Sequence, residues 1–207
     1  MRPRCGLAHG TRARPLDAAF SVIELLFVLG LVTTLSAIAV PHVLTLLDDM
    51  RTLGAVRYLS TRLQDTRMES LARTDDTAMR FTRSGSTYAV AVYVDENHNG
   101  VRTRDIESGI DRLIQPAVRL SDLFPGVDFG ALPGLPAVDT SSAPPGSDPI
   151  RLGSSDMVTF TPLGTATSGS LYVRGRRNAQ YVIRVFGETG KTRILKFSPE
   201  KYAWTPL

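Results

Sequence analysis

Cysteine and histidine are scarce in this chain of 207 residues, which holds one cysteine and three histidines. A single cysteine, Cys5, excludes an internal disulfide framework and a multi-cysteine zinc site. The histidines, His9, His42 and His98, lie far apart in the sequence, so a histidine-rich metal centre is not expected. No nucleophile stands near a base in a recognisable catalytic pattern, and we therefore predict that the protein is not an enzyme.

Charge is modest in amount but unevenly placed. Apolar residues make up 43% of the chain and charged residues 21%, which favours a packed core over wholesale disorder. The formal net charge is +4. Residues 121–150 hold four aspartates and no basic residue, whereas residues 151–207 hold nine basic and three acidic residues. A basic C-terminal region of this kind attracts polyanions.

An apolar run occupies residues 20–40, FSVIELLFVLGLVTTLSAIAV, and contains one charge, Glu24. As a helix these residues would extend about 31 Å, close to the ~30 Å hydrocarbon core of a bilayer. Soluble helices rarely stay apolar on all faces over this length, so a transmembrane helix is favoured over a buried core helix. Four arginines precede the run, which predicts a cytoplasmic N-terminus and an outward-facing remainder.

The small residues typical of a cleavage site lie before the apolar run, at Ala18 and Ala19, and not after it as in a secretory signal. The segment AFSVIELL, residues 19–26, resembles the class III signal of type IV prepilins and pseudopilins. The resemblance implies cleavage between Ala19 and Phe20 by a dedicated peptidase, followed by N-methylation of Phe20. Pro41 then falls at mature position 22, where this family has a helix-kinking proline. One departure is that the family usually has glycine before the cut, where this chain has Ala19.

Glu24 also has a physical role in this interpretation. A lone carboxylate in an apolar segment costs about 2–3 kcal/mol unless it is paired. Cleavage would place the new ammonium group of Phe20 one helical turn away, where a neighbouring chain's Glu24 could pair with it. Lateral assembly would therefore neutralise the charge. The alternative is a carboxylate that reaches the membrane interface from the helix end.

The pattern after the apolar run predicts an α+β fold. We expect Pro41 to kink or loosen the helix. An amphipathic continuation over 41–76 follows, because apolar residues recur at three- and four-residue steps from Leu44 to Leu71. Strands are expected at 78–82, 87–94, 110–120, 157–161, 170–174, 180–186 and 192–197. The short connections between them favour an antiparallel sheet, against which the helix would pack.

The expected organisation is thus a leader over 1–19, a transmembrane helix over 20–40, its amphipathic continuation, and a β-rich domain over 77–207. A Pro/Gly-rich segment at 121–156 interrupts this domain. It is too long for a simple turn, so it is a mobile excursion, a recognition loop or a tolerated surface insertion.

The order of these elements resembles the GspH/FimT family of minor pilins. The second half of the resemblance rests on Phe160, Pro162, Gly164, Ser168 and Gly169, followed by SLYVR, YVIRVF and GKTRILKF. It implies a minor pseudopilin of a type II secretion system, a structural subunit that helps to initiate or cap the pseudopilus. It further implies a bacterial inner-membrane location with a periplasmic domain. The implied partners are other pilins, the prepilin peptidase and the inner-membrane assembly platform.

Two other functions remain open at this stage. One is a minor type IV pilin that serves pilus assembly or DNA uptake. The other is an anchored periplasmic binding protein that forms no filament.

Residues 95–100, DENHNG, fit the first half of a calcium-binding loop. Asp95, Asn97 and Asn99 occupy positions one, three and five, and glycine occupies position six. Position twelve holds an isoleucine in place of the usual acid and is flanked by Asp105 and Glu107. The alternative is an Asn/Gly-rich turn between strands. Calcium is the one cofactor that the sequence admits, and no metal site is firmly predicted.

Basic residues gather in two expected hairpin turns, with Arg176 and Arg177 in one and Lys191 and Arg193 in or beside the other. The segment GKTR is similar to a Gly-Arg-x-Arg turn of DNA-binding minor pilins. If the two turns were adjacent, they would form a phosphate-binding patch with salt-sensitive affinity for DNA. A solvated strand face with alternating charges is the favoured alternative.

Overall fold

The computed structural model describes residues 21–140 and 142–207, and it divides the chain into two compact units between His42 and Val43. The predicted leader and the cleavage site at Ala19 and Phe20 lie outside the described residues. Each unit is described by itself below.

The first unit contains the beginning of helix α1, Val22–Arg73. Every side chain from 21 to 42 is exposed, and this part of the helix is long and apolar enough to cross a membrane. Two of its hydroxyl groups are satisfied within the helix: Thr33 Oγ1 donates to the Leu29 carbonyl at 2.9 Å and Thr34 Oγ1 to the Gly30 carbonyl at 2.8 Å. Internal satisfaction of polar groups is what a hydrocarbon environment requires. α1 is continuous through Pro41.

The second unit contains the rest of α1, which ends at Arg73, within the expected range of 72–76. The expected apolar stripe packs into the domain only over its middle part, where Val56, Leu59 and Leu63 are buried. Leu44 and Leu47, nearer the membrane segment, remain exposed. The amphipathic continuation therefore has a core-facing part and an uncovered apolar part.

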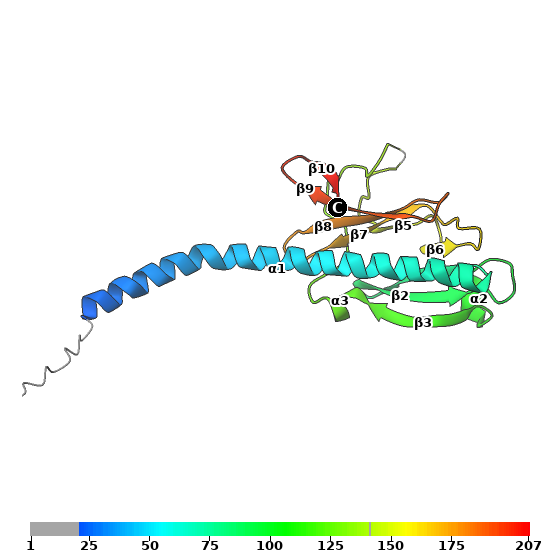
Figure 1. Ribbon diagram of the computed structural model, residues 1–207, viewed down its shortest axis with the longest axis horizontal. Coiled ribbons are helices and arrows are strands. Elements are labelled where there is room, and N and C mark those ends of the chain that lie inside the picture. Colours follow the sequence, from blue (N-terminus) through cyan, green and yellow to red (C-terminus); the bar gives the residue numbers. More distant parts are fainter. Residues whose placement is uncertain (1–20, 141) are drawn as a thin grey trace, which may run out of the picture. The chain divides into compact units, whose positions relative to one another are not determined.

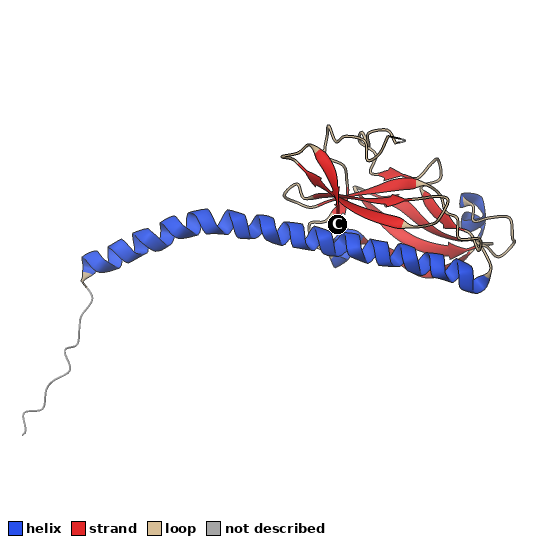
Figure 2. Ribbon diagram, turned by 45° about the horizontal axis from the view of Figure 1, so that its top comes forward, coloured by secondary structure: helices blue, strands red, loops and turns tan. Residues whose placement is uncertain are grey.

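Two antiparallel sheets complete the second unit (Figures 1 and 2). The four-stranded sheet has the order β3-β2-β1-β6, with β1 Thr77–Ser84, β2 Thr87–Val94, β3 Arg112–Arg119 and β6 Met157–Phe160. The six-stranded sheet has the order β10-β9-β8-β7-β4, with β5 also paired to β7. Its strands are β4 Asp128–Phe129, β5 Ile150–Arg151, β7 Gly169–Arg174, β8 Gln180–Val185, β9 Thr192–Ser198 and β10 Ala203–Pro206. Two short helices are present, α2 Thr103–Ser108 and α3 Leu120–Leu123.

The expected α+β class and all seven expected strands are confirmed. The strand that contains Pro116 lies at the edge of the four-stranded sheet, where its missing N–H leaves no ladder bond unmade. The sequence did not predict β4, β5 or β10. β4 and β5 have two residues each, too few to show an alternating pattern.

One apolar core joins α1 to both sheets. Val56, Leu59 and Leu63 of α1 share a single cluster with buried residues of every strand except β3, β9 and β10. The largest fully buried members of this cluster include Phe160 and Tyr181. The helix is thus the element on which both sheets pack.

The Pro/Gly-rich segment packs on the far face of the six-stranded sheet, so it is not a free excursion. Leu135 is buried in a second, small cluster with residues of β7, β8 and β9. Gln180 of β8 is hydrogen-bonded to the segment: its Oε1 accepts the N–H of Leu132 at 3.0 Å, and its Nε2 donates to the carbonyl of Gly130 at 3.1 Å. Arg184 pairs with Asp139 at 2.8 Å.

Two aspartates of α1 fix the helix to the six-stranded sheet. The buried Asp48 carboxylate accepts the backbone N–H groups of Arg176 at 2.9 Å and Arg177 at 2.7 Å, in the turn between β7 and β8. Asp49 accepts a hydrogen bond from the Tyr181 hydroxyl at 2.8 Å and pairs with Lys196 Nζ at 2.7 Å. These contacts set the axial position of α1 along the sheet.

Close approach of α1 to the β7–β8 turn requires a glycine at 175. A Cβ atom there would lie 2.3 Å from Thr52 Oγ1 and 2.6 Å from an Asp48 carboxylate oxygen. We expect Gly175→Ala to destabilise the protein by about 2 kcal/mol or more, because the added methyl group must displace the helix or the turn. Thermal unfolding of the full chain in detergent micelles measures the loss.

Gly54→Ala is the matched control. A Cβ atom at 54 would lie 3.4 Å from the Phe124 ring, an ordinary contact. Because alanine favours a helix interior by up to ~1 kcal/mol, this change should be neutral or stabilising. Equal stability of the two variants would contradict the close packing at Gly175.

Candidate functional site

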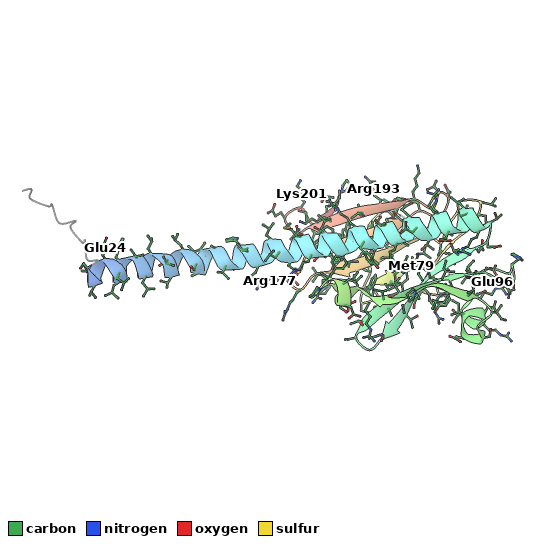
Figure 3. The ribbon with its side chains drawn as sticks, turned by 60° about the horizontal axis from the view of Figure 1, so that its bottom comes forward. Glu24, Met79, Glu96, Arg177, Arg193 and Lys201 are labelled. Carbon is green, nitrogen blue, oxygen red and sulfur yellow. The ribbon has the colours of Figure 1, made fainter. Side chains whose placement is uncertain are left out.

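The clearest functional feature of the first unit is a single carboxylate on an exposed apolar helix. Glu24 lies in the first turn of α1 and is exposed, as Figure 3 shows. Its neighbours are among the most exposed apolar residues of the described chain, with Ile23 at 76% and Phe27 at 72%. Within residues 21–140 and 142–207 the Glu24 carboxylate has no ion pair or side-chain hydrogen bond.

The cost of the Glu24 charge depends on what surrounds the helix. In water an exposed carboxylate is hydrated, but in hydrocarbon it must neutralise or pair. The apolar side chains around Glu24 likewise have no cover within the first unit. A lipid bilayer would cover this apolar surface, and a cation on another chain would satisfy the carboxylate.

The four basic residues proposed for DNA do not lie together. Arg176 and Arg177 belong to the turn before β8, whereas Lys191 and Arg193 lie at the turn after it. β8 has six residues, so the two turns are separated by about 20 Å. Figure 3 shows Arg177 and Arg193 well apart. The two turns are therefore not adjacent, because consecutive turns of a meander lie at opposite ends of the shared strand, and the condition for one continuous patch is not met.

Each basic turn has a different environment. The backbone of Arg176 and Arg177 is tied to Asp48, and both side chains border an open groove of about 520 Å³ lined also by Leu44, Leu47 and Arg51. Arg193 lies opposite Arg184 in the β8–β9 register. Since Arg184 is already paired with Asp139, this end carries less free positive charge than the sequence suggests.

The turn at 95–100 is closed by its own side chains. Asp95 is buried, and its carboxylate accepts the N–H groups of Asn97 at 3.1 Å and Gly100 at 2.5 Å. Asn97 Oδ1 accepts the N–H of Asn99 at 3.3 Å. No group of three His, Cys, Asp or Glu side chains in the part of the chain that the structure describes is already arranged as a metal site.

The two acids that flank position twelve of the calcium-loop pattern, Asp105 and Glu107, differ in burial and in their partners. Glu107 pairs with Arg80 at 3.2 Å and is exposed, so it does not face the turn as a substitute ligand. Asp105 is buried, as is Asp111 a few residues later. Sequence reasoning missed Asp111 because it lies outside the twelve-residue loop pattern.

Several carboxyl groups of the domain have a raised pKa. Burial is the main cause for Asp76, Asp111, Asp128 and Asp156. The charge of Asp95 adds to the raised pKa of both Asp76 and Asp111. A carboxyl group whose pKa is raised on folding binds its proton more tightly in the folded state.

The raised pKa values of these carboxyl groups predict that the folded protein becomes more stable on mild acidification. Because the folded pKa of these four carboxyls lies above the unfolded value, their contribution to stability increases as pH falls from neutral toward the unfolded pKa of about 4. In the presence of EDTA we expect the full chain in detergent micelles to melt at a higher temperature at pH 5.5 than at pH 7.5. Asp128→Asn should reduce this difference. A melting temperature that falls steadily over the same range would contradict the expectation.

Comparison of the chain with protein-family models, with curated proteins and with solved structures found no match.

Proposed function

We propose that the protein is a minor pseudopilin of a type II secretion system, a structural subunit that helps to start or cap the pseudopilus. The observation that carries this proposal is the lone Glu24 on an exposed apolar helix, directly after a prepilin-like signal. An ordinary membrane anchor has no use for a carboxylate in this position. A subunit that assembles through its apolar helix needs one to pair with its neighbour.

The proposed mechanism begins with removal of residues 1–19 by the prepilin peptidase. In a processed chain that is helical from its first residue, the ammonium group of Phe20 would lie about 6 Å before Glu24 along the helix axis. Pairing between the ammonium of one chain and Glu24 of the next therefore offsets adjacent helices by roughly one turn. Both charges become neutralised within an apolar surrounding, where an unpaired charge is costly.

The apolar helix has two successive environments in this mechanism. Before assembly, lipid covers the exposed side chains of 22–40, and the helix stores the subunit in the bacterial inner membrane with its domain in the periplasm. During assembly, neighbouring helices replace the lipid. The partners are other pilins, the peptidase and the inner-membrane assembly platform, and any ATPase that drives assembly is a separate protein.

The alternative of a minor type IV pilin shares the same signal, helix and charge pairing. Its variant in DNA uptake cannot draw on one continuous basic patch, because Arg177 and Arg193 lie at opposite ends of β8. The secretion proposal does not depend on these residues.

Loss of the protein should block secretion. In a strain that lacks the gene, we expect folded exoproteins to accumulate in the periplasm, and wild-type protein should restore their release. A Glu24→Val variant should restore at least about tenfold less, since each 1.4 kcal/mol of lost pairing energy is a factor of ten in assembly. The measurement is the exoprotein content of medium and periplasm.

Glu200→Gln is the matched control, because it removes an exposed carboxylate from a turn of the domain and should restore secretion fully. Unchanged secretion in the deletion strain would refute the secretion proposal. Unchanged secretion with loss of surface pili would favour the type IV pilin instead. Normal secretion and piliation would favour the anchored protein that forms no filament.

A further inference from the structure

The connection between β2 and β3 buries an unusual amount of negative charge. It consists of the turn after Val94, helix α2 and the residues before Arg112. Three aspartates of this connection are buried: Asp95 is 3% exposed, Asp105 is 8% exposed and Asp111 is 3% exposed. Buried carboxylates in proteins are normally paired with a cation or bound to a metal ion.

Two oxygen atoms of these aspartates have no partner. Asp95 uses both oxygens to accept backbone N–H groups, and Asp111 Oδ2 accepts the N–H of Arg102 at 3.1 Å. Asp111 Oδ1 and Asp105 Oδ2, in contrast, are shielded from solvent and accept no hydrogen bond from the described residues. Leaving such an atom unsatisfied costs about 1–3 kcal/mol, and more when it is charged.

No basic side chain of the described chain neutralises this charge. The nearby Arg80 and Arg112 pair with Glu107 and Glu96, at 3.2 Å and 2.5 Å. None of the three buried aspartates has a salt bridge within the described ranges.

The carboxylates also act on one another. Burial raises the pKa of Asp111 most, the N–H of Arg102 opposes this, and the charges of Asp95 and Asp105 raise it further. The backbone N–H of Glu96 lowers the pKa of Asp111. Asp111 Oδ1 accepts no hydrogen bond from the described residues. Asp111 therefore feels the charge of both other aspartates, although the three side chains are not arranged as a metal site in the described part of the chain.

The turn before α2 already has the internal bonding of a calcium loop. Asp95, at position one, accepts the N–H of Gly100, at position six, and thereby closes the loop. Gly100 has φ of 85°, a conformation that glycine adopts without strain. The loop pattern lacks an acid at position twelve, where the sequence has Ile106.

We propose that this connection binds a calcium ion, with Asp105 and Asp111 replacing the missing acid at position twelve. Asp95, Asn97 and Asn99 would supply the first side-chain ligands, and the carbonyl of Val101 stands at the position where calcium loops use a backbone oxygen. All of these donors are oxygens, which suits calcium and not zinc or copper. Since the carboxylates do not yet converge on one point, the ion must draw α2 and Asp111 toward the loop.

Calcium binding would tie the end of β2 to the start of β3. The ion neutralises the buried charge and fixes the edge strand of the four-stranded sheet. This role does not rest on the proposed secretion function, because the site lies wholly within the second unit.

Direct binding is tested on the full chain in detergent micelles after removal of metals with EDTA. Terbium replaces calcium in oxygen sites, and Tyr93, which packs with Val101 and Ile106, lies close enough to sensitise it. We expect tyrosine-excited terbium luminescence that excess calcium displaces. We also expect saturating calcium to raise the melting temperature by about 5 °C or more, and magnesium to raise it less.

Variants show whether the named residues hold the ion. Asp95→Asn and Asp111→Asn should each abolish the calcium-dependent shift and the luminescence, whereas Asp122→Asn, an exposed aspartate of α3, should retain both. In EDTA, Asp111→Asn should melt at or above the wild-type temperature, because it removes an unpaired buried charge. Absence of both signals from the wild-type protein in 10 mM calcium, chosen as roughly the weak limit of calcium sites, would overturn the proposal. So would their persistence in both variants.

Discussion

The packing of Val56, Leu59 and Leu63 against both sheets is the contact on which the rest of the domain depends. Each sheet is too small to bury its apolar face alone, and both use the same stripe of α1. The stripe therefore makes the helix the centre of the core. The same helix begins with apolar residues, so one element combines a segment that could cross a membrane with the centre of a folded domain.

Polar contacts fix the axial position of α1 against the six-stranded sheet, which apolar packing alone does not determine. An apolar stripe permits axial sliding by a turn, but the Asp48 carboxylate bonds to two particular backbone N–H groups of the β7–β8 turn. Gly175 admits that contact by having no side chain. Asp49 adds a second fixed point at Tyr181 and Lys196. The position of the six-stranded sheet along the axis of α1 is thus set by the hydrogen bonds and the ion pair of Asp48 and Asp49.

Much of this architecture could be predicted from periodicity alone. The β-rich composition of segments such as residues 87–94 and the breaks at short turns located the strands, and the change of pattern after Asp76 located the helix end. That Arg176 and Lys191 lie at opposite ends of β8 follows from the expected strand 180–186 between them, a consequence that the DNA hypothesis overlooked. No sequence signal indicated the burial of Asp111, since burial arises from the whole connection. The processing residues Ala19 and Phe20 and the role of Glu24 remain predictions from a motif and from the cost of a lone charge.

The central claim is that the apolar helix becomes an assembly element once a leader is removed before it. The most direct measurement is the intact mass of the protein purified from cells that contain the prepilin peptidase. The account predicts a chain of residues 20–207 with one methyl group on the amino group of Phe20. A chain that keeps residues 1–19, or one cut after the apolar run, would contradict it.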